Sequence, residues 1–276
     1  MANANGQVDV TDAASANVTN SFGPVTVRDV RGPLTIVNSN GSVTAAGVRG
    51  VAKVASSFGP IDVRDVSADA TIENSNGAVK LATVHGAAFV KTSFATTDVA
   101  AVAGPLTVTS SNGAVLVRDV GGEVDVRGSF GRVDAEGLKA GIRVTTGNSG
   151  VRIAEARGAV TVTTTFGPVE LRNVEGKVEV RNQNGTIDAS VASKPGACHD
   201  ITLATSFSPI QVQLPDGGYA ITAQTSFGRI RSDVPITATG TMGDGHLSGT
   251  IGGGGCALQL TNANGDIRIL KRDATR

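Results

Sequence analysis

Two cysteines and three histidines are the residues of this sequence whose side chains could most readily bind a metal or react. Cys198 and His199 are adjacent, and Cys256 follows near the C-terminal end of the chain. A zinc site would need ligands paired at short spacings, and that pattern is missing. A Cys198–Cys256 disulfide is the alternative for an exported protein, and two free thiols are the favoured interpretation. The residues alone leave these alternatives open.

A recurrent Val-Arg-Asp-Val segment is the second chemical candidate, because a ladder of such charges could bind a linear glycan. It occurs at 27–30, 63–66 and 117–120, and Leu-Arg-Asn-Val at 171–174 is a variant of it. The simpler and favoured interpretation is a solvent-facing corner whose Arg and Asp side chains neutralise each other.

Other signatures of catalysis or metal binding are missing from the sequence. It contains no separate cluster of carboxylates for glycoside cleavage, no Gly-Gly-x-Gly-x-Asp calcium repeat, no serine nucleophile elbow and no phosphate loop. We therefore expect a protein that is not an enzyme, with no catalytic residue, no metal and no cofactor.

Composition and charge exclude further classes of protein. The 24 basic and 24 acidic residues are scattered and sum to a formal net charge of zero, so no basic stripe is available for nucleic acid. The apolar runs are far shorter than the roughly 18–20 residues needed to span a bilayer, which predicts no transmembrane segment. The first residues lack the pattern of a signal peptide. Val, Ala and Ile, with 36 Gly and no Trp, suit a narrow, layered interior built from strands.

Internal repetition is the strongest structural signal. Triplets such as Ser-Phe-Gly and Ser-Asn-Gly recur with a constant 18-residue period from Ser21 to Gln183. With the first triplet residue as position 1, apolar residues recur at positions 5, 7, 10, 14 and 16, and Gly is common at position 12. The pairs 5/7 and 14/16 alternate as in half-buried strands, so each unit predicts two short strands. In one unit the inward residues are Val25, Val27, Val30, Leu34 and Ile36.

These units favour a parallel β-solenoid over an antiparallel meander. A solenoid explains constant corner residues, because each position stacks on its equivalent about 4.8 Å away. A meander has no reason to conserve the corner at a constant period. We expect an all-β protein of about fourteen 18-residue coils.

The second triplet position alternates between Phe and Asn, so the sequence repeats best with a 36-residue period. An 18-residue coil, favoured because the inward positions match in every unit, would alternate Phe and Asn along one corner. A 36-residue coil of four strands would stack Phe on Phe and Asn on Asn. In the stacked solenoid, corner Asn side chains are expected to add a ladder of amide hydrogen bonds. We assign a structural role to Phe22, Phe58, Phe94, Phe130, Phe166, Phe207 and Phe227, and to Asn40, Asn76, Asn112 and Asn184.

Regularity ends near residue 191. Residues 1–191 are expected to form regular repeats, and residues 192–276 to form irregular closing coils of the same continuous domain. An insertion interrupts the period at 192–200, and residues 257–269 fit the unit again, with Leu258 and Leu260 at positions 14 and 16. The chain begins inside the repeat, so we expect an uncapped strand edge that invites pairing.

The closing residues also carry a family resemblance. The V-x-V repeats with Asn-Gly corners, ending in Gly249-Thr-Ile-Gly-Gly-Gly-Gly-Cys256 and Asn264-Gly-Asp-Ile-Arg-Ile269, resemble the bacterial β-strand-repeat family called domain of unknown function 4097, an adhesin-like family. The resemblance covers nearly the whole chain. It implies a β-solenoid exported to the cell envelope or cell surface, without established catalytic residues. The missing export signal is the one departure.

The first functional hypothesis is therefore a non-catalytic, adhesin-like solenoid that presents an extended surface to a protein, a glycan or a second copy at the bacterial cell envelope. The alternatives are a subunit that assembles end to end into filaments through its solenoid ends, and a polysaccharide-active enzyme on a β-helix scaffold. A chain with one Tyr and no Trp offers little for a sugar-stacking cleft.

Overall fold

The computed structural model describes residues 1–194, 197–239 and 245–272, and these residues form strands without any helix. The chain divides into two compact units, unit 1 (Met1–Ala140) and unit 2 (Gly141–Arg276). The expected change from regular to irregular repeats at residues 191 and 192 therefore falls inside unit 2.

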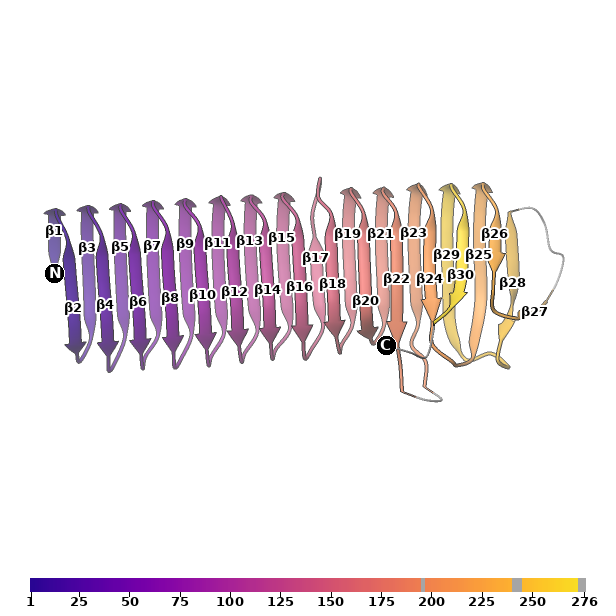
Figure 1. Cartoon of the computed structure of the whole chain (residues 1–276), viewed down its shortest axis with the longest axis horizontal. Helices are drawn as coiled ribbons and strands as arrows, with labels where there is room; N and C mark the ends of the chain where they lie inside the picture. Colours follow the sequence, from indigo (N-terminus) through magenta and orange to yellow (C-terminus); the bar gives the residue numbers. More distant parts are fainter. Residues whose placement is uncertain (195–196, 240–244, 273–276) are drawn as a thin grey trace. The chain divides into compact units, whose positions relative to one another are not determined.

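Unit 1 consists of eight two-strand coils (Figure 1). Its strands are β1 (Ala2–Asn5), β2 (Val8–Ala13), β3 (Ala16–Phe22), β4 (Val25–Val30), β5 (Leu34–Asn40), β6 (Val43–Val48), β7 (Ala52–Phe58), β8 (Ile61–Val66), β9 (Ala70–Asn76), β10 (Val79–Val84), β11 (Ala88–Phe94), β12 (Thr97–Val102), β13 (Leu106–Asn112), β14 (Val115–Val120), β15 (Val124–Phe130) and β16 (Val133–Leu138). Odd-numbered strands form one parallel sheet and even-numbered strands form the other, as a solenoid requires.

The register of unit 1 fixes the length of the coil. Val25 pairs with Val43, and Val43 pairs with Ile61, so each step along the sheet is one 18-residue period. Only the first coil is one residue shorter, because Val8 pairs with Val25. Phe58 lies between Asn40 and Asn76 on the neighbouring strands. The 18-residue coil is therefore correct, and the 36-residue coil with Phe stacked on Phe is wrong.

The core of each coil is built from the expected inward positions. Val25, Val27, Val30, Leu34 and Ile36 are all 1% exposed or less. Equivalent Val, Ile, Leu and Ala side chains stack on them from the coils above and below, because successive coils are in register. β-branched side chains pack well on such pleated faces, so the sequence and the sheet favour the same conformation.

Unit 2 begins with the same pattern and closes with a different one. Its strands are β17 (Ile142–Thr145), β18 (Val151–Ala156), β19 (Val160–Phe166), β20 (Val169–Glu175), β21 (Val178–Asn184), β22 (Ile187–Ala192), β23 (Ile201–Phe207), β24 (Ile210–Leu214), β25 (Tyr219–Phe227), β26 (Ile230–Ser232), β27 (Thr237–Ala238), β28 (His246–Ile251), β29 (Cys256–Asn264) and β30 (Ile267–Lys271).

The last coil of the chain is inserted out of sequence order. β29 lies between β23 and β25 and is parallel to both, and β30 lies in the same way between β24 and β26 (Figure 1). β28 then pairs antiparallel with β25, and β27 pairs antiparallel with β28. This end of unit 2 therefore presents antiparallel strands in one of its two sheets rather than another parallel coil.

The expected count of about fourteen uniform coils needs a correction. The 18-residue spacing, with the one shorter first coil, applies to eleven coils, eight in unit 1 and three in unit 2. The coils of β23/β24, β29/β30 and β25/β26 have other offsets, because the insertion at 192–200 and the out-of-order closure lengthen the connections.

Candidate functional site

The corner that carries the Ser-Phe-Gly and Ser-Asn-Gly triplets is tightly stacked. Gly23, Gly41 and Gly59 at position 3 have φ between 110° and 129°. A Cβ on Gly41 would lie 2.3 Å from the carbonyl oxygen of Gly23, and a Cβ on Gly59 would lie 2.4 Å from that of Gly41. Glycine best satisfies both the positive φ and this close approach, which explains why it recurs at this corner in most coils.

The aromatic side chains at position 2 of this corner are exposed. Phe22, Phe58, Phe94 and Phe130 in unit 1 are 51–55% exposed. In unit 2, Phe166 and Phe207 are 49% and 52% exposed, and Phe227 is 77% exposed. Asn occupies the same position on the intervening coils, so we call this line of position-2 residues within each unit the Phe/Asn ridge.

The out-of-order closure preserves this alternation in unit 2. Phe207 and Phe227 belong to consecutive triplets in the sequence, without an Asn triplet between them. In space, Asn264 of β29 pairs with Phe207 on one side and with Phe227 on the other. The ridge of unit 2 therefore alternates through Asn148, Phe166, Asn184, Phe207, Asn264 and Phe227.

A layer of buried polar side chains supports the ridge from inside. Asn38 at position 18 is 2% exposed and donates from Nδ2 to the carbonyl oxygens of Gly23 (3.3 Å) and Gly41 (3.1 Å), thereby linking two coils. The same pattern recurs at Asn20 and Asn74. The hydroxyl groups of Thr164 and Thr205 each lie 3.2–3.3 Å from two acceptors, a carbonyl oxygen of the preceding coil and that of the Phe two residues later. This amide ladder lies at position 18 and not at the expected Asn40, Asn76, Asn112 and Asn184 of position 2. An Asn, Ser or Thr two places before almost every ridge residue was the available signal, with Gly128 before Phe130 as an exception.

A groove of about 350 Å³ runs beside the ridge in unit 1 and crosses four coils. The coils place Ser39, Ser57, Ser75 and Ser93 along it, one serine from each coil. The other lining residues come from positions 17 and 18 and are Val37, Asn38, Ala55, Ser56, Glu73, Asn74 and Lys91. Each groove serine immediately precedes a ridge residue in the chain, so the ridge borders the groove. From the sequence alone, these serines are recognisable only as markers of the repeat.

The Val-Arg-Asp-Val segments have a backbone role. Asp29, Asp65 and Asp119 have φ of 54–57°, and Asn173 of the variant segment has φ of 59°. Asp and Asn tolerate this left-handed conformation better than most residues, which explains their recurrence at position 9. Arg118 pairs with Asp98 on the preceding coil at 2.7 Å, rather than with its neighbour Asp119.

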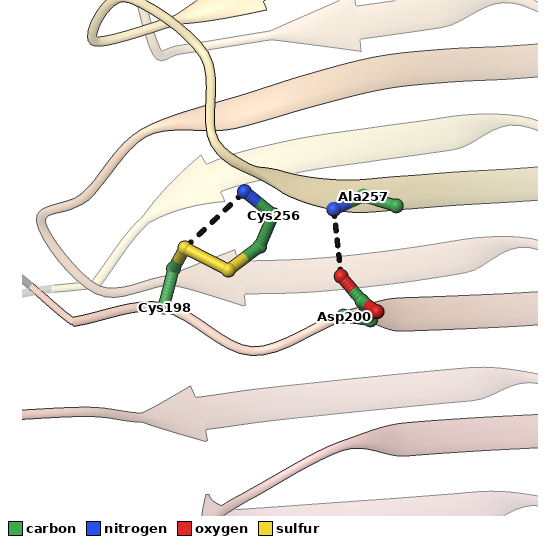
Figure 2. The surroundings of a disulfide bond; sticks show 4 residues. All are labelled: Cys198, Asp200, Cys256 and Ala257. Carbon is green, nitrogen blue, oxygen red and sulfur yellow. Dashed lines mark hydrogen bonds between the residues drawn. A yellow bond between two sulfur atoms is a disulfide. The ribbon is translucent and has the colours of Figure 1, made fainter.

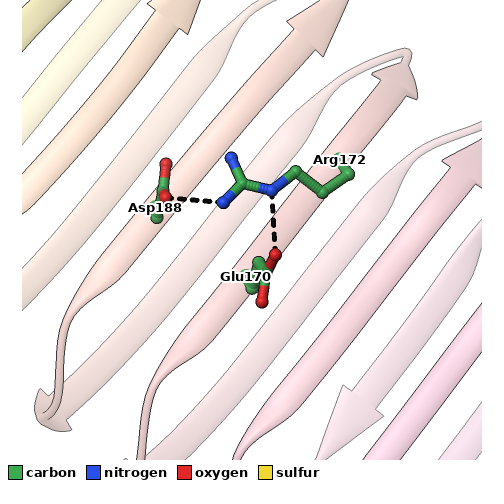
Figure 3. A network of polar contacts seen from close by, with 3 residues as sticks. All are labelled: Glu170, Arg172 and Asp188. Atoms are coloured by element: carbon green, nitrogen blue, oxygen red, sulfur yellow. Dashed lines mark hydrogen bonds and ion pairs between the residues drawn. The ribbon is translucent and has the colours of Figure 1, made fainter.

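Arg172 of the variant segment holds two carboxylates. Its Nε donates to Glu170 at 2.9 Å and its terminal nitrogen donates to Asp188 on the next coil at 2.8 Å (Figure 3). Burial lowers the pKa of Arg172, but hydrogen bonds and charge interactions with Glu170 and Asp188 outweigh it and raise the pKa above its ordinary value. Both acids therefore form ion pairs with the same guanidinium.

Cys198 and Cys256 form a disulfide in the structure, with a Cα–Cα distance of 5.9 Å (Figure 2). It connects the insertion that precedes β23 to the first residue of β29. The adjacent Asp200 accepts a hydrogen bond from the Ala257 amide at 2.9 Å, beside the disulfide (Figure 2). His199 is half-buried next to them. In the described ranges, no group of three or more His, Cys, Asp or Glu side chains is arranged to hold a metal ion.

Comparison with known proteins gives one family and no individual relative. The sequence pattern of the Toastrack DUF4097 family matches residues 103–270. No curated protein and no solved structure matches the chain. The part of the chain that the structure describes contains no helix with the length and apolar character needed to cross a membrane.

Proposed function

This chain belongs to the Toastrack DUF4097 family, and we propose that it is a non-catalytic, adhesin-like protein of the bacterial cell envelope that binds its partner along the Phe/Asn ridge. The partner is a protein or a glycan surface. The solenoid supplies a rigid, repetitive backbone, and the ridge supplies the side chains that make contact.

One observation carries this proposal: phenylalanine is half-exposed at a position where the neighbouring coils fold with asparagine. Phe58 and its strand neighbours Asn40 and Asn76 occupy the same backbone position in register. A Phe side chain buries roughly 150–250 Å² when it is fully enclosed. At half exposure it forgoes roughly 2 kcal/mol of burial free energy. A partner that covers the rings would recover that free energy, whereas a purely structural corner could use Asn in every coil.

The contacts of the ionisable groups favour binding over catalysis. Glu170 and Asp188, on neighbouring even-numbered strands, are both bound by Arg172. Glycoside cleavage needs two carboxyl groups that face a scissile bond, whereas both of these acids form ion pairs with the same guanidinium. The proposed role is therefore that of a surface.

The disulfide supports a location outside the cytoplasm. Disulfides such as Cys198–Cys256 persist in the periplasm and at cell surfaces and are rare in a reducing cytosol. The membership of the chain in the family is consistent with this location. Fractionation of cells that express the native gene would test it, and recovery of the protein in the cytosol with reduced thiols would contradict it.

Sedimentation of the purified protein with isolated bacterial cell envelopes tests the function directly. The variant carries Phe58→Asn and Phe94→Asn, since Asn is the residue found at this position on the adjoining coils. The control is Phe89→Thr, which removes a 39% exposed Phe at position 15, where both neighbouring coils carry Thr. We expect the double variant to lose binding and the control to retain it. Equal binding by the double variant and the wild type would overturn the proposal.

A further inference from the structure

We propose that unit 1 binds a proline-rich segment of a partner protein in the polyproline II conformation, laid along the Phe/Asn ridge and the groove beside it. The inference rests on the proposed function and specifies its partner. It uses three features of the surface: the spacing of the rings, the polar groups of the groove, and the direction of the strands.

The spacing of the phenylalanines matches the repeat of a polyproline II helix. Phe58 and Phe94 are separated by two coils, with Asn76 between them. Neighbouring parallel strands lie about 4.8 Å apart, so equivalent atoms of the two phenylalanines are separated by about 9.6 Å. A polyproline II helix rises about 3.1 Å per residue and repeats every three residues, which is about 9.3 Å. Every third residue of such a segment would therefore lie over an Asn coil, between two rings.

The match persists along unit 1 because the ridge repeats. Phe22, Phe58, Phe94 and Phe130 define three equal steps. The mismatch between the two periods is about 0.3 Å per step, so it accumulates to only about 1 Å over the four rings. Small adjustments of the side chains can absorb such a difference.

The polar groups of the groove suit the backbone of this conformation. A polyproline II helix has no internal hydrogen bonds, so its carbonyl oxygens remain free to accept. Ser57 and Ser75 place hydroxyl donors along the groove, one from each coil. The four corner residues of each coil from Ser21 to Ala114 include no Asp, Glu, Lys or Arg, and Glu73 and Lys91 line the groove beside them. Grooves lined by aromatic rings are the surfaces by which proline-rich segments are recognised.

The direction of the strands disfavours an extended β-segment as the ligand. A β-strand places residues of one face about 6.6 Å apart, which matches neither one coil nor two coils. A bound strand also gains affinity by pairing with the edge of a sheet. The ridge and groove run across the strands, so a segment lying in them meets side chains rather than a sheet edge.

The test measures binding of poly-L-proline of about twelve residues to the full chain by fluorescence anisotropy of the labelled peptide, because this peptide adopts the polyproline II conformation. A flexible Gly-Ser peptide of equal length is the control ligand. We expect binding of poly-L-proline alone, weakened at least about tenfold by Phe58→Asn with Phe94→Asn and unchanged by Phe89→Thr. Unfolding curves establish that each variant is folded.

A second variant tests the spacing itself. Phe58→Asn combined with Asn76→Phe conserves composition but puts two phenylalanines on adjacent coils and breaks the two-coil period. We expect the same weakening as in the double Asn variant, and unchanged affinity would overturn the proposal.

The outcomes separate this inference from the proposed function. If a β-1,4-linked hexasaccharide binds with the same dependence on Phe58 and Phe94 and poly-L-proline does not, the inference fails and the proposed function stands. If the Phe variants alter neither peptide binding nor envelope binding, both fail.

Discussion

The regular coils of unit 1 and the closing coils of unit 2 bury similar side chains but are held together differently. In unit 1 each strand pairs with the equivalent strand of the next repeat, so successive coils can add one after another. In unit 2, Leu203 pairs with Leu260, which is several repeats farther along the chain, and the inserted strands separate coils that are consecutive in sequence. Pairing across a longer loop costs more closure entropy, so the closing coils depend more on individual long-range contacts, such as disulfides and side-chain hydrogen bonds.

Unit 2 contains several such long-range contacts. The disulfide fixes the start of β29, and the Arg272 guanidinium donates to the Val191 carbonyl oxygen at 3.0 Å and to the side chain of Asn173. These contacts span 58, 81 and 99 residues. Repetition stabilises the regular coils, whereas a small number of long-range contacts stabilises the closure. Substitutions in each region can break the two kinds of support separately.

The largest effect is expected from a charge inside the regular coils. Val117 is fully buried and stacks between Val99 and Ala135. Val117→Asp should lower the free energy of unfolding by about 4 kcal/mol or more, because an unpaired carboxylate would enter an apolar layer. Urea unfolding followed by circular dichroism measures the loss.

Thr109→Asp is the matched control for that substitution. Thr109 is only half-buried, and its strand neighbours are Lys91 and Arg127, so a carboxylate there gains favourable charges. Its unfolding free energy should remain within about 0.5 kcal/mol of the wild type. If Val117→Asp changed stability as little as Thr109→Asp does, the inward assignment of position 7 would be wrong.

A smaller and localised effect is expected from removing the disulfide. Replacing Cys198 and Cys256 together by Ala should cost about 2–4 kcal/mol, because the reduced chain regains loop entropy when it unfolds. Hydrogen exchange should accelerate in β29, β30 and β25, while the strands of unit 1 keep their protection. Reduction of the wild-type protein should reproduce this pattern. Unaltered exchange in β29 would show that strand pairing alone holds the inserted coil.

The same contrast explains what could be predicted from the sequence. The stacking of Val25 on Val43 follows from an 18-residue period, and the burial of these residues follows from their alternation within strands. Both are local, repeated signals. The position of β29, in contrast, depends on long-range strand pairing that occurs once and is not repeated along the chain. The sequence showed only that Leu258, Leu260 and Asn264 fit the repeat.

The proposed binding surface could be predicted only in part from the sequence. The repeat identified the ridge phenylalanines but gave them a structural role, because alternation alone does not state how far a corner side chain is exposed. The half-exposure of Phe58 depends on how the coil bends at Gly59, whose φ is 110°. The groove depends on the small side chains of neighbouring coils, such as Ala55 and Ser57, lying together in register.

The only tyrosine tests the packing of the closing coils. Tyr219 is fully buried on β25, and no group in the described residues forms a hydrogen bond with its hydroxyl. Tyr219→Phe should therefore raise the free energy of unfolding by about 1–2 kcal/mol, because a buried, unsatisfied hydroxyl is removed. A decrease in stability would show that the hydroxyl has a partner in solution.

Alkaline titration sharpens this test. Burial raises the pKa of Tyr219, so the native state favours the neutral phenol. This contribution to stability is fully present below about pH 10, the pKa of the unfolded state, and is lost as pH rises through the higher native pKa. Wild-type protein should lose stability in that range while Tyr219→Phe should not. Because the chain has one Tyr, tyrosinate absorbance reports this residue alone.

The smallest effect concerns an imperfect repeat in unit 1. Ala95 occupies the corner position held by Gly59 and Gly131 in other coils and has φ of 77°. Ala95→Gly should stabilise the protein by about 0.5–1 kcal/mol, because glycine adopts this conformation without the Cβ penalty. Ala100→Gly in β12 of the same coil should destabilise it by a similar amount, since a strand interior gains nothing from glycine. If Ala95→Gly raises the free energy of unfolding and Ala100→Gly lowers it, backbone strain at this corner limits the stability of the coil. If both substitutions lower it equally, the entropy of the unfolded chain outweighs that strain even at the corner.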